Sequence, residues 1–248
     1  MTTQHGNMSS IAYACAALAI ILAVVAITAG FGTRMGWWGF RTGLSLLRWS
    51  AYAELAVAAA ALIGCILASS RGQGNSLYLF IPACVVSMAA LIVPFRMYII
   101  ARSVPAIHDI TTDMENPPRF DAVLDLRKNA LNPAEYGGTE IAQQQKKAYP
   151  DLAPLMLEDS PGKAFERASS AAQSMGWQIV RADPAKGLIE ATDTTFWFGF
   201  KDDIVIRIKP QENGSRIDIR SLSRVGKSDV GANAGRIRRF FTALKKGA

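Results

Sequence analysis

The feature that most restricts the fold of this chain is a long run of residues without a single charged side chain, from Ser9 to Gly30. Two further apolar stretches follow, at residues 46–69 and 77–101. About 20 apolar residues in a helix cross the hydrocarbon core of a bilayer. Buried helices of a soluble protein would need polar faces, which these Ala, Leu, Ile and Val runs lack. The sequence therefore predicts a membrane domain of three spans over residues 1–101.

Charge divides the chain at the same point. Residues 1–101 contain five basic side chains and one acidic, whereas residues 102–248 contain 22 basic and 19 acidic. We therefore expect a soluble part from residue 102 onward. All three cysteines lie within the predicted spans, so disulfide usage says nothing about the compartment. The composition excludes a disordered, collagen-like or disulfide-framework protein.

Two ionisable residues lie inside the predicted spans, Glu54 in the second and Arg96 in the third. The two spans are antiparallel, and at 1.5 Å per residue the side chains lie about 12 Å and 7 Å deep, so they can meet. Charged groups inside a bilayer are costly and usually paired. We expect an intramembrane pair of structural role, or Arg96 alone reaching for the interface, in preference to a proton or substrate path.

The connection at residues 31–45 interleaves Trp and Phe with Arg34 and Arg41, a composition typical of a segment in the head-group layer. The connection between the second and third spans contains one basic residue, Arg71. Because basic residues favour the cytoplasmic side, this count places the first connection and the C-terminal domain in the cytoplasm. The side assigned to the cytoplasm exceeds the other side by about two basic residues.

The soluble part is predicted to have an α+β fold. Residues 102–154 are interpreted as an extended or looping connector packed on the domain, with short helices near 120–129 and 139–148. Residues 155–248 are interpreted as the core domain, with the order α-β-β-β-β-α and an antiparallel sheet covered by helices on one face. Alternation at 204–209 and 216–220 predicts strands with one solvent-exposed face. The predicted elements are a helix from Pro161 to Met175, strands at 177–181, 187–192, 204–209 and 216–220, and a helix at 230–244.

The connection between the second and third of these strands is rich in aromatic residues. These rings are expected to close the end of the core or to dock the domain on the membrane, rather than to form a ligand pocket with Trp197 and Lys201. Ser228 or Asp229 is expected to cap the last helix, whose N-terminus could also hold an anion near Arg224 and Lys227. Residues 201–248 carry 12 basic and five acidic side chains, and a solvated basic face explains this excess most simply.

Four residues have the chemistry of an acid-base or metal site: His108, Asp109, Asp113 and Asp193. A loop that follows a membrane span is also commonly rich in Asp and Thr for its turns. His108 is the one histidine of residues 102–248, so no Ser-His-Asp order can be argued, and no cysteine is available there as a nucleophile. Glycine-rich phosphate-binding loops are missing as well.

Three segments resemble signature segments of the domain-of-unknown-function 1499 (DUF1499) family: 103–118, 189–203 and 221–233. The resemblance covers residues 103–245, and the N-terminal part, with Gly32-Thr-Arg34 and Phe40-Arg-Thr-Gly43, is similar to the family's long membrane form with three spans. The family has no settled activity. Its short members often begin with export signals, which implies an extracytoplasmic domain, in conflict with the arginine count.

The sequence favours a non-enzymatic protein of a bacterial inner membrane, part of the cell envelope. Its α+β domain is expected to bind anionic lipid head groups or an envelope protein at the bilayer surface. The alternative is a membrane-bound enzyme that acts on a lipid or envelope substrate through His108 and the three aspartates, which requires those side chains to converge in one cleft. Transport by the spans ranks third, since three helices form a pathway only by oligomerising. No cofactor, metal ion or nucleic acid is expected, and the oligomeric state stays open.

Overall fold

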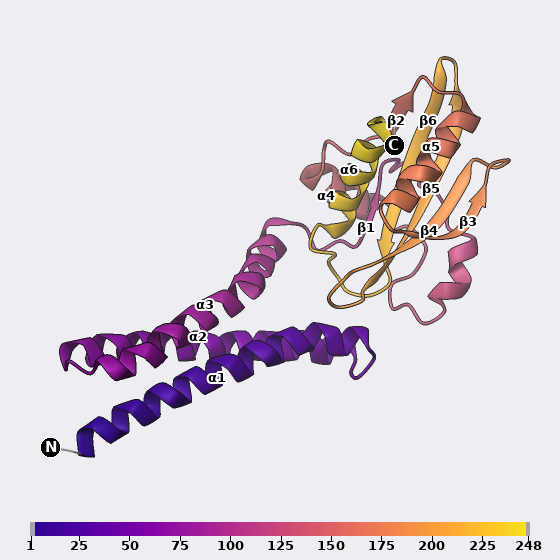
Figure 1. Ribbon diagram of the computed structural model, residues 1–248. Helices are drawn as coiled ribbons and strands as arrows, with labels where there is room; N and C mark the ends of the chain where they lie inside the picture. The colour runs from indigo at the N-terminus through magenta and orange to yellow at the C-terminus, as the bar shows by residue number, and fades with distance from the viewer. Residues whose placement is uncertain (1–2, 247–248) are drawn as a thin grey trace. The chain divides into compact units, whose positions relative to one another are not determined.

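The computed structural model describes residues 3–246, with side chains from Met8 onward, and it divides into two units (Figure 1). The membrane unit contains the chain up to Ile99 together with Phe196–Gly199. The sheet unit contains Ile100–Thr195 and the chain from Phe200. A short piece of the C-terminal half of the sequence thus belongs with the N-terminal helices.

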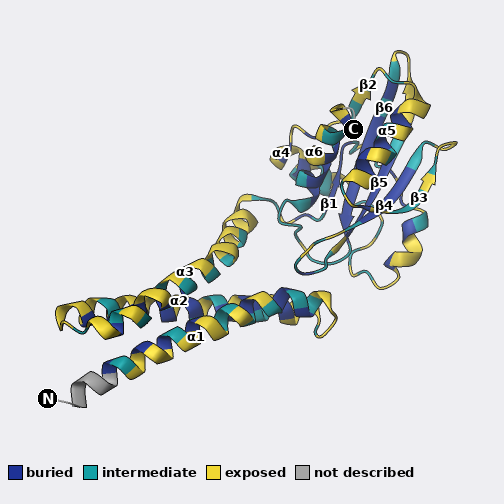
Figure 2. Cartoon of the chain, viewed as in Figure 1, coloured by how far each residue is buried: buried dark blue, intermediate teal, exposed yellow. Residues whose placement is uncertain are grey.

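The membrane unit consists of three long helices, α1 (Thr3–Arg34), α2 (Phe40–Ser70) and α3 (Gly74–Ser103). Each is long and apolar enough to cross a membrane, which confirms the three predicted apolar helices. The described part of these helices is mostly exposed or half-buried, as the colours of Figure 2 show. The large aliphatic and aromatic side chains lie mostly exposed, whereas the buried positions are mainly small, such as Ala12, Ala61 and Ala83. This inverted pattern suits helices that face lipid and pack closely on each other through small residues.

The first connection is shorter than the sequence indicated, because α1 continues to Arg34 and α2 begins at Phe40. The indole nitrogen of Trp38 donates a hydrogen bond to the carbonyl oxygen of Ala29 at 3.1 Å. Gly32 has no side chain where the Trp38 ring lies, and a Cβ there would collide with it. The turn between α1 and α2 is therefore held by an aromatic ring that folds back on α1.

The sheet unit is built on one antiparallel sheet in the order β1-β6-β5-β4-β3, and β2 pairs with the same edge of β6 as β1. The α+β class is confirmed. The short strand β1 comes from the segment interpreted above as an extended connector, and the short strand β2 from the start of the core domain, where no strand was predicted. The strands are β1 (Asp109–Thr111), β2 (Leu155–Leu157), β3 (Gln178–Asp183), β4 (Leu188–Thr194), β5 (Lys201–Gln211) and β6 (Gly214–Ser223).

Helices α5 (Pro161–Ser174) and α6 (Ala232–Lys245) pack on one face of this sheet (Figure 1). The residues of these strands that point into that layer and are buried in its hydrophobic core are Ile204, Ile206 and Ile208 of β5 and Ile217 and Ile219 of β6. Trp177 stacks on Phe240 of α6 with ring centroids 5.4 Å apart. These contacts form the main hydrophobic core of the unit.

The opposite face of the sheet is covered in its central part, so the prediction of a solvent-exposed face is wrong there, although Lys209 at the end of β5 is exposed. Val205 and Asp218 are completely buried, and Arg220 almost so. The chain between Asp113 and Tyr136, which includes the 3₁₀ helix η1 (Ala122–Arg127), lies over them. Polar residues that alternate with apolar ones along a strand usually face solvent. In this sheet the polar side chains instead form ion pairs with each other beneath a second layer of chain.

Helix α4 (Gly138–Ala148) lies beside β1, and one of its side chains forms hydrogen bonds with the backbone of that strand. The amide of the fully buried Gln145 accepts a hydrogen bond from the backbone nitrogen of Thr111 at 3.0 Å and donates one to its carbonyl oxygen at 2.6 Å. An amide side chain thus takes the place of the next strand beside β1.

Candidate functional site

Two adjacent carboxylates on β5, Asp202 and Asp203, organise the polar centre of the sheet unit. Successive side chains of a strand point to opposite faces of the sheet. Asp202 therefore points to the layer of α5 and α6, and Asp203 to the layer that contains η1. Both are buried, and each meets a different arginine cluster.

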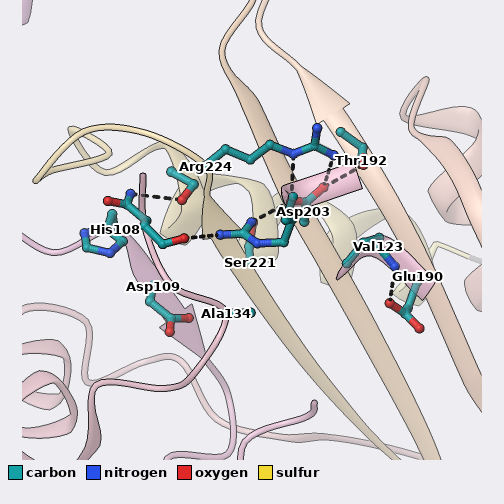
Figure 3. Close-up of polar contacts among 12 residues, drawn as sticks. His108, Asp109, Val123, Ala134, Glu190, Thr192, Asp203, Ser221 and Arg224 are labelled. Carbon is teal, nitrogen blue, oxygen red and sulfur yellow. Dashed lines mark hydrogen bonds and ion pairs between the residues drawn. The ribbon is translucent and has the colours of Figure 1, made fainter. Parts of the chain in front are cut away.

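Asp203 accepts four hydrogen bonds. Figure 3 shows how Arg224 and Thr192 lie against its carboxylate. Arg127 donates to it at 2.6 Å, and Arg224 donates from its Nε and terminal nitrogens at 2.9 and 2.8 Å. The hydroxyl of Thr192, on the neighbouring strand β4, donates at 2.7 Å. A buried carboxylate is tolerated only with such complete pairing. Arg127 of η1 is thereby fixed to the centre of the sheet.

Asp202 belongs to a cluster around Arg236 of α6. The guanidinium donates to Asp202 at 2.5 Å and to Asp193 of β4 at 2.8 Å. It also donates to Ser221 and Asn233. Burial lowers the pKa of Arg236, but the two carboxylates outweigh that effect and the net change is upward. Arg236 is therefore a permanent cation that joins α6 to the ends of β4, β5 and β6.

Asp109 of β1 is paired with Arg220 of β6 through two hydrogen bonds of 2.9 and 2.7 Å. The guanidinium of Arg220 also lies over the rings of Phe120 and Tyr136, at 4.9 and 5.5 Å from their centroids. Burial, with a smaller contribution from Asp109, raises the pKa of Tyr136 to about 12. The Tyr136 hydroxyl is therefore neutral at physiological pH.

Asp113 forms a separate network with Arg207, Arg216 and Asp218. Both arginines donate to Asp113, at 2.9 and 2.8 Å, and both also bind Asp218. His108 has other partners: its Nδ1 is 3.2 Å from the carbonyl oxygen of Lys227, and its own carbonyl oxygen accepts hydrogen bonds from Ser223 and Asn233.

The four acid-base candidates therefore do not converge in one cleft. Asp109 and Asp113 lie on one face of the sheet and bind different arginines, whereas Asp193 lies on the other face with Arg236. Each of these carboxylates already accepts hydrogen bonds from an arginine, so the oxygens that a catalytic group would offer to a substrate are engaged within the protein. The arrangement joins strands, α6 and the η1 layer rigidly to each other.

The proposed anion site at the start of α6 is occupied by the chain itself. The carboxylate of Asp229 accepts hydrogen bonds from the backbone nitrogens of Gly231 and Asn233, at 2.9 and 2.6 Å. Burial raises the pKa of Asp229, while these backbone hydrogen bonds act in the opposite direction. Arg224 is committed to Asp203, whereas Lys201 and Lys227 are exposed.

Trp197 lies in the membrane unit. Its indole nitrogen donates to the carbonyl oxygen of Ile27 in α1 at 2.9 Å. Gly30 makes room for the ring, since a Cβ at that position would overlap it. Beside it, Phe196 meets Phe31 edge to face at 5.6 Å, and Arg34 donates to the carbonyl oxygen of Phe196 at 2.8 Å. The aromatic segment is therefore packed against α1.

The intramembrane pair of Glu54 and Arg96 is not formed. Glu54 accepts a hydrogen bond from the Ser87 hydroxyl of α3 at 2.6 Å, and Arg96 lies exposed on the same helix. Ser87 precedes Arg96 by nine residues, about 13 Å along a helix. Equal depth in the membrane therefore does not bring Arg96 to Glu54, because the Ser87 hydroxyl of α3 lies nearer to that carboxylate.

Glu190 is an important residue that the sequence reasoning missed. Its carboxylate accepts from the backbone nitrogens of Asp121, Ala122 and Val123, at 3.0, 2.9 and 3.1 Å, and so caps η1 from the sheet below. Figure 3 shows the contact with Val123. The sequence feature that could have identified Glu190 is its position inside the predicted strand at 187–192, because a charged side chain that is buried in a strand needs a partner.

Among the residues that the structure describes, no group of three or more His, Cys, Asp or Glu side chains could hold a metal ion. A family model described as "Protein of unknown function (DUF1499)" matches residues 109–244, more than half of the chain. The comparison with curated proteins found no match.

Proposed function

This chain belongs to the DUF1499 family, and from that premise we propose that it is a membrane-anchored, non-enzymatic protein whose α+β domain binds anionic lipid head groups at the bilayer surface. The observation that carries the proposal is the aromatic segment Phe196–Gly199, which leaves the sheet between β4 and β5 and packs with the membrane helices. The salt bridges of Asp109, Asp113 and Asp193 support a binding role over acid-base catalysis.

A short connection gives further support. Three residues, 104–106, separate the end of α3 from Ile107, which is buried in the core of the sheet unit. An extended chain spans at most about 3.6 Å per residue, so Ile107 lies within about 14 Å of the end of α3. The sheet unit thus meets head groups at a high effective concentration, and even a low intrinsic affinity is sufficient.

The exposed positive charge is concentrated on α6. Six of the seven arginines in 201–248 are bound to aspartates, namely Arg207, Arg216, Arg220, Arg224, Arg236 and Arg238. The exposed basic side chains of this region for which no ion pair is found among the described residues are Lys201, Lys209, Lys227, Arg239, Lys245 and Lys246. Three of these belong to α6 and its C-terminal cap, which favours this helix as the lipid-binding element.

The test compares the full chain in vesicles of neutral lipid with vesicles that also contain anionic lipid, by hydrogen exchange. We expect slower exchange of the α6 amides on anionic vesicles, and loss of this difference at high salt. The double substitution Lys245→Glu and Lys246→Glu should abolish it, since two lysines near an anionic surface contribute about 2 kcal/mol.

The matched control is Lys146→Glu with Lys147→Glu, two exposed lysines in the last turn of α4. It makes the same change of charge at the same kind of helix end and should leave the protection of α6 intact. Equal exchange on neutral and anionic vesicles would refute the lipid-binding proposal. If both double variants reduced the protection of α6 equally, binding would depend on the net charge of the protein and not on the lysines at the end of α6.

We further propose that the domain lies on the extracytoplasmic side of a bacterial inner membrane, as the resemblance to exported family members implies. The arginine count argues for the opposite side. Alkaline phosphatase and fluorescent-protein fusions after Ala248 decide between them. Phosphatase activity supports the outer side and outer-leaflet head groups, whereas fluorescence alone places the domain in the cytoplasm.

A further inference from the structure

The membrane unit contains one carboxyl group, Glu54, in the middle of α2. It lies on the buried stripe of that helix, between Ser50 and Val57, and is 1% exposed. Its Oε2 accepts the hydrogen bond from Ser87 at 2.6 Å. Its Oε1 has no hydrogen-bond partner among the described residues. The site is thus a half-satisfied carboxyl group between two membrane helices.

Among the described residues, no hydrogen bond or ion pair other than that from Ser87 compensates a negative charge on Glu54. The hydroxyl of Ser50, one turn before Glu54, donates to the carbonyl oxygen of Leu47 at 3.0 Å. Arg96, the one basic residue of α3 before its last turn, is exposed rather than directed to Glu54. An ionised carboxylate with a bare oxygen inside a helix bundle is far more costly than a neutral carboxyl group with an unused hydroxyl.

We infer that Glu54 is a proton-binding site of the membrane unit. The proton lies on Oε1, and Oε2 is the carbonyl oxygen that accepts from Ser87. A bound metal cation is the competing ligand, but hard cations take six or more oxygen ligands, and a single hydroxyl contacts this carboxyl group. Because Glu54 and Ser87 belong to different helices, the occupancy of the site is linked to the packing of α2 against α3.

The test is infrared difference spectroscopy of the full chain in lipid vesicles at neutral pH, which requires no reagent to reach the buried site. The carbonyl stretch of a protonated carboxyl group is separated from the bands of a carboxylate. The difference between wild type and Glu54→Gln should show the loss of one protonated-carboxyl band. Glu115→Gln, at an exposed glutamate of the sheet unit, is the matched control and should remove carboxylate bands instead.

A second variant assigns the band to the site. Ser87→Ala removes the hydrogen bond to Oε2, so the protonated-carboxyl band should persist and move to higher frequency. This variant also serves as the test if Glu54→Gln fails to assemble. Loss of carboxylate bands in Glu54→Gln, or no shift of any protonated-carboxyl band in Ser87→Ala, overturns the inference. Neither result bears on lipid binding by the sheet unit.

Discussion

At the scale of single residues, the sheet unit depends on aspartates that are each matched to an arginine. Asp203 is the most demanding case, because it compensates both Arg127 and Arg224 while fully buried. Removal of one member of a buried ion pair leaves an uncompensated charge, which usually costs about 3–5 kcal/mol. The stability of the unit should therefore respond sharply to isosteric changes at these positions.

The variant Asp203→Asn keeps the shape of the side chain but turns an amide toward the two arginines. We expect the free energy of unfolding of the sheet unit to fall by about 3–5 kcal/mol in urea titrations followed by circular dichroism. The control is Asp125→Asn, which removes an exposed pair with Lys128 and should change stability by less than about 0.5 kcal/mol. Similar effects of both variants would contradict this account.

Asp151 provides a pH-dependent test. The hydrogen bond from Arg238 lowers the pKa of Asp151 in the folded protein, although slight burial acts against it. A carboxylate with a lowered folded pKa stabilises the fold above its unfolded pKa, and this contribution is lost as the pH falls through the folded value. Because the pair is exposed, it contributes at most about 1 kcal/mol.

Asp151→Asn should therefore destabilise the protein slightly at neutral pH and have no effect in acid well below the ordinary aspartate pKa of about 3.9. Urea midpoints measured across this range for wild type and variant give the comparison. Glu158→Gln, at an exposed glutamate, is expected to show no such convergence. A difference for Asp151→Asn that stays constant in acid would exclude the pair as its cause.

At the scale of elements, η1 is fastened to the sheet at both ends, by Glu190 at its start and by Arg127 at its end. Glu190→Gln leaves one acceptor oxygen and turns an NH₂ group toward backbone nitrogens. Hydrogen exchange of amides 121–123 should accelerate in accord with a loss of about 1–3 kcal/mol, while the global stability changes less. Glu166→Gln, on the exposed side of α5, should leave these amides unchanged.

The elements also show how far the sequence could be read. The helices and the four longer strands follow from periodicity, and the α+β class follows from their order. Strands β1 and β2 have three residues each, which is too short for an alternation of apolar and polar residues to be recognised in the sequence. The second covered face was missed because Asp218 and Arg220 read as solvent-facing residues, and only the tertiary structure brings the segment around η1 over them.

The site was harder to predict than the fold. His108 and the three aspartates have the residue types of a catalytic site, and single-sequence reasoning contains no information on which arginine each carboxylate will meet. Several aromatic residues in one connection, Trp197 among them, are easily recognised in the sequence. Their position beside Ile27 and Gly30 is not, because it depends on contacts between residues that are about 170 positions apart.

At the scale of the whole molecule, the two units have separate cores. Among the described residues, the buried members of two hydrophobic clusters of the sheet unit all lie between Ile107 and Leu244. We therefore expect a fragment of residues 103–248 to fold without the spans and to unfold cooperatively on heating, as monitored by circular dichroism. In this fragment Trp197 loses its contact with α1 and should be quenched readily by a soluble quencher, unlike Trp197 in the full chain.

The control is the same fragment with Trp197→Phe, in which the remaining tryptophan, Trp177, is buried against Phe240 and should resist the quencher. A fragment without a cooperative transition would show that the spans are required for folding of the sheet unit. A fragment whose Trp197 stays protected would show that the segment packs on the sheet unit itself.

The opposite directions of Asp202 and Asp203 have a consequence for how β5 finds its place. Ile204, Val205 and Ile206 are all buried, so both faces of this strand are apolar and hydrophobic burial distinguishes poorly between neighbouring alignments. A slip of one residue would turn each aspartate away from its arginine and toward the wrong layer. The two carboxylates therefore act as a register lock, which penalises misaligned pairings that the isoleucines alone would tolerate.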